Sequence, residues 1–117
     1  MDGTQIILIK SLWPNIKKQA IRFGKQIDLN VKGILGNLWV NVNEYKDSNF
    51  LHHHPGCLLS GVYYIDVPDE NMGDIHFERE DDAEYFLPRF MPGRNQITAV
   101  RASYKPKTGN GLIFPSW

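Results

Sequence analysis

A single cysteine, Cys57, is all that the 117 residues contain, so the chain cannot form an internal disulfide. Free thiols persist in reducing compartments, which favours the cytoplasm. No apolar run approaches the ~20 residues of a membrane span, and the start Met1–Thr4 lacks the basic and apolar regions of a secretory signal. The sequence therefore predicts a cytoplasmic protein without a membrane partner.

Neither sign of charge is in excess, since 13 Lys and Arg residues balance 13 Asp and Glu residues. A neutral chain has no long-range field that would collect polyanions, so nucleic acid is not expected as a partner. Hydrophobic residues make up 42% of the chain and charged residues 22%, an ordinary globular composition. A chain of this length builds one core, so we expect a single domain over residues 1–117.

An amphipathic helix is predicted over residues 11–27. Ser11 can cap a helix that starts at about Leu12, and Pro14 is tolerated in a first turn. Apolar residues then recur at helical spacing, at Ile16, Ala20, Phe23 and Ile27. The cations between them lie mostly off this stripe and are interpreted as a solvated face.

The remaining chain, residues 38–117, has the texture of a β core. Leu38 to Asn43 alternates apolar and polar side chains, the period-2 pattern of a strand. Further strands are expected at Leu58–Val67, Asp74–Glu78, Gln96–Tyr104 and from Leu112 onward. The turn around Asn71 to Gly73 suggests that the second and third of these strands form a hairpin. Short strands after one helix favour a mainly β sandwich or barrel.

The stretch His52-His53-His54-Pro55-Gly56 carries the clearest chemistry. Extended backbone places His52 and His54 on one face, where two neutral imidazoles could bind iron, zinc, copper or nickel. The plainer interpretation is a solvated loop rich in histidine. The following strand favours the site, because it brings Ser60 and Tyr64 to one face, where their hydroxyls could hydrogen-bond a carboxylate.

Five short motifs follow one another along the chain: Trp39-Val40-Asn41, His52-His53-His54-Pro55, Ser60-Gly61-Val62-Tyr63-Tyr64, Gly73-Asp74-Ile75-His76-Phe77 and Phe114-Pro115-Ser116-Trp117. In this order they resemble the family of 2-oxoglutarate- and iron(II)-dependent oxygenases of phages and bacteria. The resemblance spans about residues 38–117, and a phage origin would make the location the host cytoplasm.

The resemblance implies a double-stranded β-helix, or jelly-roll, that binds iron(II) through His52 and His54. Its cosubstrate would be 2-oxoglutarate, and the expected cofactor-binding residues are Asn41, Ser60 and Tyr64. No residue is predicted as catalytic, because the iron does the oxidative chemistry. Three other residues could replace a histidine if the loop folds differently: Asp66, Asp74 and His76.

The superfamily's third ligand, a histidine, and its 2-oxoglutarate-binding arginine follow the Phe-Pro-Ser-Trp strand, and neither has a counterpart here. The run Leu112 to Trp117 also ends without the polar tail usual in domains. These features predict a truncated, inactive domain that self-associates through an exposed sheet edge. A non-catalytic jelly-roll binding module and a cupin-type metalloprotein are the alternatives. The substrate, a small molecule or a peptide, is not identified.

Overall fold

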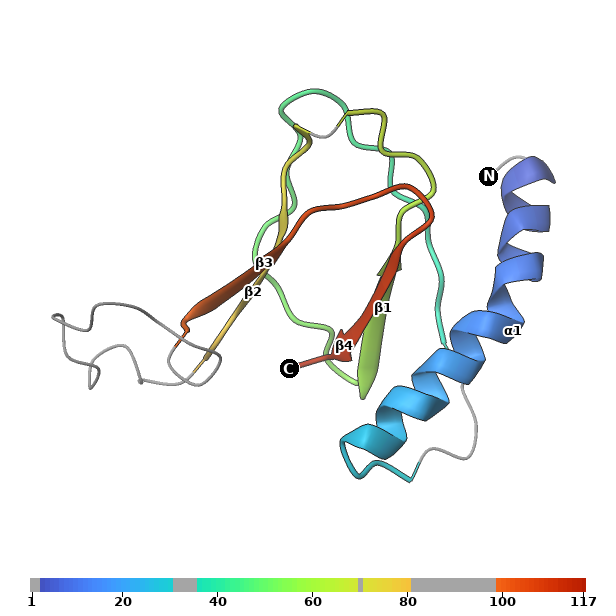
Figure 1. Ribbon diagram of the computed structural model, residues 1–117, viewed down its shortest axis with the longest axis vertical. Coiled ribbons are helices and arrows are strands. Elements are labelled where there is room, and N and C mark those ends of the chain that lie inside the picture. Colours follow the sequence, from blue (N-terminus) through green and yellow to red (C-terminus); the bar gives the residue numbers. More distant parts are fainter. Residues whose placement is uncertain (1–2, 31–35, 70, 81–98) are drawn as a thin grey trace, which may run out of the picture. The chain divides into compact units, whose positions relative to one another are not determined.

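The computed structural model describes residues 3–30, 36–69, 71–80 and 99–117 (Figure 1). Within them lie one helix and four strands: α1 (Gly3–Gln26), β1 (Leu59–Tyr63), β2 (Ile75–Glu78), β3 (Arg101–Tyr104) and β4 (Gly111–Pro115). The contacts divide the chain into two compact units, Met1–Val62 with Leu112–Trp117, and Tyr63–Gly111. We call them the first and the second unit.

The secondary structure is β-rich with one helix, which agrees with the predicted class at that level. The four described strands form two separate two-stranded sheets, whereas a jelly-roll has about eight strands. Among the described helices, none is both long and apolar enough to cross a membrane.

Helix α1 begins at Gly3, so the predicted start at Leu12 with a Ser11 cap is wrong. Pro14 lies inside the helix, where its missing N–H removes only one backbone hydrogen bond and the helical turns before it persist. The predicted apolar stripe is confirmed, since Ala20 is buried and the other stripe residues are half-buried while the cations are exposed.

The end of α1 is closed by its own backbone, one residue before the predicted end. Asp28 adopts a left-handed conformation with φ 59°. The Leu29 N–H donates to the Gly24 carbonyl (2.7 Å) and the Asp28 N–H donates to the Lys25 carbonyl (3.3 Å). These two bonds make a Schellman motif, which satisfies carbonyls that the helix end would leave unpaired.

The strand predicted from Leu38 to Asn43 is wrong, because this segment is irregular in the structure. Alternation gives a stable strand only when one face is covered and the backbone is paired. On one face Leu38 is 52% and Val42 81% exposed, and on the other Trp39 is 59% exposed, so neither face of the segment is well covered.

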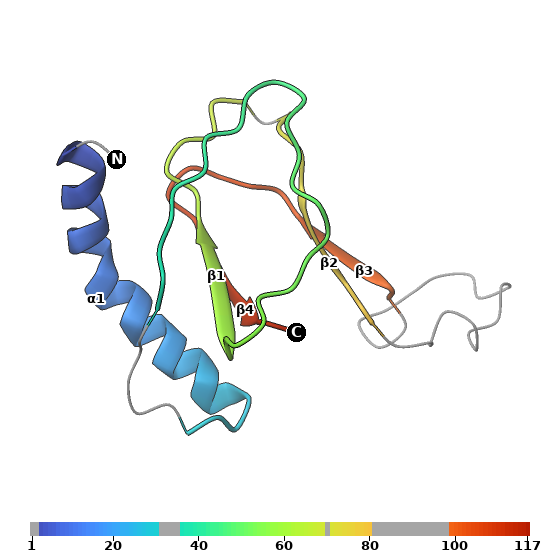
Figure 2. The same cartoon turned by 180° about the vertical axis from the view of Figure 1, so that it is seen from behind.

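Strands β1 and β4 lie side by side in both views (Figures 1 and 2). Ser116 N–H donates to the Leu58 carbonyl at one end (3.1 Å), and Tyr64 N–H donates to the Asn110 carbonyl at the other (2.9 Å). The residue numbers rise in one strand as they fall in the other, so the pair is antiparallel.

Strands β2 and β3 pair antiparallel in the second unit, from Ile75 opposite Tyr104 to Glu78 opposite Arg101. The predicted hairpin of Leu58–Val67 with Asp74–Glu78 is therefore wrong, since β1 pairs with β4 and β2 with β3. The prediction joined strands that are neighbours in sequence. Here each of them pairs with a strand that comes later in the chain, beyond the reach of a local turn.

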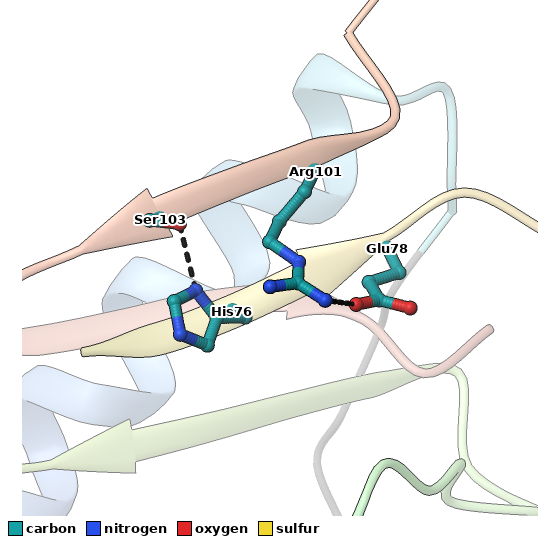
Figure 3. A network of polar contacts seen from close by, with 4 residues as sticks. All are labelled: His76, Glu78, Arg101 and Ser103. Carbon is teal, nitrogen blue, oxygen red and sulfur yellow. Dashed lines mark hydrogen bonds and ion pairs between the residues drawn. The ribbon is translucent and has the colours of Figure 1, made fainter. Parts of the chain in front are cut away.

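The two faces of the β2–β3 pair differ in polarity. On one face His76 bonds Ser103, with Nδ1 and Oγ 2.7 Å apart, and Glu78 makes an ion pair with Arg101 (Figure 3). On the other, the rings of Phe77 and Tyr104 meet edge to face, with centroids 5.9 Å apart. A slip by one residue would exchange these faces, so the cross-strand pairs favour the observed register.

Gly61 is required where β1 meets β4. A Cβ atom at this position would lie 3.0 Å from the Leu112 carbonyl oxygen, a backbone atom that cannot move without disturbing the pair. We expect Gly61→Ala to destabilise the fold by about 1–3 kcal/mol, the usual cost of overpacking. Urea unfolding followed by circular dichroism measures this loss.

Gly73→Ala is the matched control. A Cβ at Gly73 meets nothing within 4 Å and the backbone there is not left-handed. Since alanine restricts the unfolded chain more than glycine does, this variant should be neutral or more stable by up to about 1 kcal/mol. Equal losses in the two variants would contradict the close approach at Gly61.

Candidate metal centre

His52 and His54 approach one another in the first unit, as their alternate spacing predicts. Their ring centroids are 4.9 Å apart and the rings meet edge to face. Two imidazoles bound to neighbouring positions of one metal ion, each nitrogen about 2.0–2.1 Å from the metal, have ring centres about 4.5–5 Å apart. The separation therefore suits a shared metal ion.

The protonation of His52 is set by its own chain. Its Nδ1 lies 2.5 Å from the Phe50 carbonyl oxygen. A carbonyl can only accept, so Nδ1 carries the proton and the Nε2 lone pair of the neutral ring is left for another partner. A ring N–H bonded to a carbonyl is the usual arrangement of a metal-binding histidine.

His54 is followed by a tight turn. The Cys57 N–H donates to the His54 carbonyl (3.2 Å), and Gly56 has φ 81°. Pro55 in the second position and glycine in the third are the pattern of a type II turn, because only the third position needs positive φ. The Pro55-Gly56 pair thus reverses the chain direction directly after His54.

Ser116 links the histidine motif to the β1–β4 sheet. Its carbonyl accepts the His54 N–H at 3.4 Å, while its own N–H donates to the Leu58 carbonyl at 3.1 Å. With 7% of its surface exposed, it is the one buried polar residue among those described. A backbone hydrogen bond between His54 and Ser116 therefore connects the His-x-His-Pro motif to the Phe-Pro-Ser-Trp motif.

The Ser60 hydroxyl bonds the Ser116 hydroxyl, with the two oxygens 2.6 Å apart. Ser60 was predicted to contact the cosubstrate. In the structure its half-buried side chain hydrogen-bonds another protein residue, Ser116. Sequence reasoning gave Ser116 no role. The signal available was a polar residue within the otherwise apolar run Leu112 to Trp117.

Trp39 lies beside the histidine pair. Its ring centroid is 6.1 Å from that of His54, with the planes tilted by 38°. Asn41, two residues on, is exposed. The first unit thus contains five of the residues that the sequence singled out: Trp39, Asn41, His52, His54 and Ser60.

The other predicted residues belong to the second unit. Burial raises the pKa of the Tyr64 phenol above its ordinary value, which keeps the phenol protonated as a hydrogen-bond donor. Asp66 and Asp74 are exposed, and His76 bonds Ser103 across β2 and β3.

The described residues contain no group of three or more His, Cys, Asp or Glu side chains arranged to hold a metal ion. The histidine pair has two rings whose nitrogens are of the kind that bind metals, whereas a facial iron(II) site has three protein ligands. The pair fits part of such a site in donor type and spacing.

A comparison with known families finds a match. The model of a family described as "Putative 2OG-Fe(II) oxygenase" matches residues 37–117, most of the chain and the whole stretch that holds the five motifs. Neither a search of curated proteins nor one of solved structures gave a significant match.

The tautomer of His52 can be tested directly. Free imidazole side chains favour the proton on Nε2, whereas the bond to Phe50 holds it on Nδ1 in His52. We expect long-range ¹H–¹⁵N NMR spectra of the metal-free protein at pH 8 to show the Nδ1–H form for His52. A predominant Nε2–H form would contradict the geometry.

Proposed function

Because the chain belongs to the 2OG-Fe(II) oxygenase family, we propose that it is an oxygenase domain that holds iron(II) through His52 and His54. The observation that carries the proposal is the convergent pair of rings, one of them with Nδ1 bonded to a carbonyl. Fold resemblance alone would not support a reaction, since function depends on the site.

The residues of the chain would orient and enclose the iron. His52 would bind through Nε2, while the turn after His54 and the bond to Ser116 hold the second ring. Neutral imidazoles leave the positive charge of the metal uncompensated, which favours an anionic cosubstrate. Bound iron(II) supplies the oxidative chemistry, which couples decarboxylation of 2-oxoglutarate to oxidation of a C–H bond in the substrate.

The other cosubstrate and metal groups are part of the same proposal. Asn41 and Tyr64 would each contribute to binding 2-oxoglutarate. We also propose a jelly-roll for the domain and a cytoplasmic location, in the host if the protein is from a phage.

A non-catalytic binding module is the second candidate. The observation that favours it is the ligand count, since the described residues offer two histidines and no third ligand beside them. Such a module would keep the β framework and bind its partner without iron chemistry. The two candidates differ in what iron(II) and 2-oxoglutarate do together.

Anaerobic titration with iron(II) and 2-oxoglutarate tests the proposal. When both bind one site, the iron chelate gives a visible metal-to-ligand charge-transfer band. We expect this band from the protein when iron(II) and 2-oxoglutarate are added together. His52→Ala should abolish the band, because one ligand and its fixed tautomer are lost.

His76→Ala is the matched control, since it removes a histidine that bonds Ser103 in the second unit. It should leave the band unchanged. If the protein gives no band, or if His52→Ala retains it, the histidine pair does not hold the iron and the binding module takes its place.

Exposed apolar side chains support the proposal that this chain self-associates. Tyr45 is 91% exposed, Phe50 89% and Trp117 72%. Uncovered apolar surface and unpaired strand edges favour contact between copies. Multi-angle light scattering should show a mass that rises with protein concentration. A constant monomer mass from micromolar to millimolar concentration would contradict self-association.

A further inference from the structure

We propose that the Ser60–Ser116 hydroxyl pair is a positioning device for the metal ligand His54. The inference rests on the proposed iron site and adds two residues that act through the protein and do not touch the metal. It gives Ser60 a role different from the predicted contact with 2-oxoglutarate.

The position of His54 depends on bonds to other segments, because its own segment is not part of a strand. Residues 52–54 are irregular. The His54 carbonyl accepts the Cys57 N–H, and the His54 N–H donates to the Ser116 carbonyl. The bond to Cys57 lies within the turn and moves with it. The bond to Ser116 connects His54 to the residue that follows β4.

That bond is long, with the His54 nitrogen 3.4 Å from the Ser116 carbonyl oxygen. Hydrogen bonds of this length weaken further with small changes in distance or angle. The strength of this bond therefore depends on the position of the Ser116 peptide. If Ser116 moves, the backbone of His54 and with it the His54 ring can move too.

Ser116 stands just past the end of β4. Its backbone bond toward β1 is the N–H bond to the Leu58 carbonyl. Leu58 is the residue before β1, and the hydroxyl bond to Ser60, which lies within β1, adds a second anchor two residues further on. The two bonds together fix both the place and the rotation of the Ser116 peptide.

The surroundings favour this role over a catalytic one. Ser116 is 93% buried, so its hydroxyl loses water on folding and depends on Ser60 for a partner. The two hydroxyl oxygens are 2.6 Å apart, so one hydroxyl donates its proton to the other. A cosubstrate would have to compete for a bond that the protein already makes.

The test removes each hydroxyl and measures cobalt(II) binding with the metal alone as the probe. Ser116→Ala and Ser60→Ala should each weaken cobalt(II) binding about tenfold, the lower end of the range for groups that orient metal ligands. The double variant should lose no more than either single variant, since both remove one bond. Ser60→Thr, which keeps a hydroxyl on β1, should recover most of the affinity.

Thr108→Ala is the matched control, because it deletes a hydroxyl that bonds the Val67 backbone in the second unit. Its cobalt(II) affinity should equal that of the unmodified protein. Near-ultraviolet circular dichroism of each sample shows whether the fold is retained, so that a loss of affinity is not a loss of folded protein.

A metal-free measurement separates this inference from the proposed function. Hydrogen exchange of the His54 amide, which donates to Ser116, should be about tenfold faster in Ser116→Ala and unchanged in Thr108→Ala. Unchanged exchange together with unchanged cobalt(II) affinity in Ser116→Ala overturns the positioning role. If His52→Ala binds cobalt(II) as well as the unmodified protein, the proposed iron site fails, and the exchange result alone decides the role of the pair.

Discussion

The geometry around the histidines depends on the backbone of Ser116. One residue accepts the His54 N–H, donates to Leu58 and shares a hydroxyl bond with Ser60. Segments 56 residues apart in the chain are thereby joined at one buried position. A two-stranded sheet is marginally stable by itself, so these side-chain and loop bonds matter more here than they would in a large sheet.

The histidine pair shows how local backbone prepares a site. The bond to Phe50 fixes the proton of one ring, and the Pro-Gly turn ends the motif directly after the other. Trp39 lies beside His54, with ring centroids 6.1 Å apart. Each of these contacts is made without a metal, which lowers the ordering cost when an ion binds.

The amount that the sequence could predict differs between local and long-range features. The ring pairing of His52 and His54 and the apolar stripe of α1 follow from periodicity, and both are confirmed. The predicted start of α1 was wrong because Ser11 and Pro14 together have the pattern typical of a helix start. The strand pairing was wrong because alternation shows that a segment can pair, without showing its partner. Ser116 was missed since its role comes from strand pairing.

X-ray absorption at the metal edge of the iron(II)-loaded protein tests the central claim most directly, namely that His52 and His54 bind one ion together. The account predicts the scattering pattern of two imidazoles with nitrogens about 2.0–2.2 Å from the metal, falling to one in His52→Ala. A shell of oxygen atoms without imidazole scattering would contradict it, because the two rings that lie 4.9 Å apart would then share no metal.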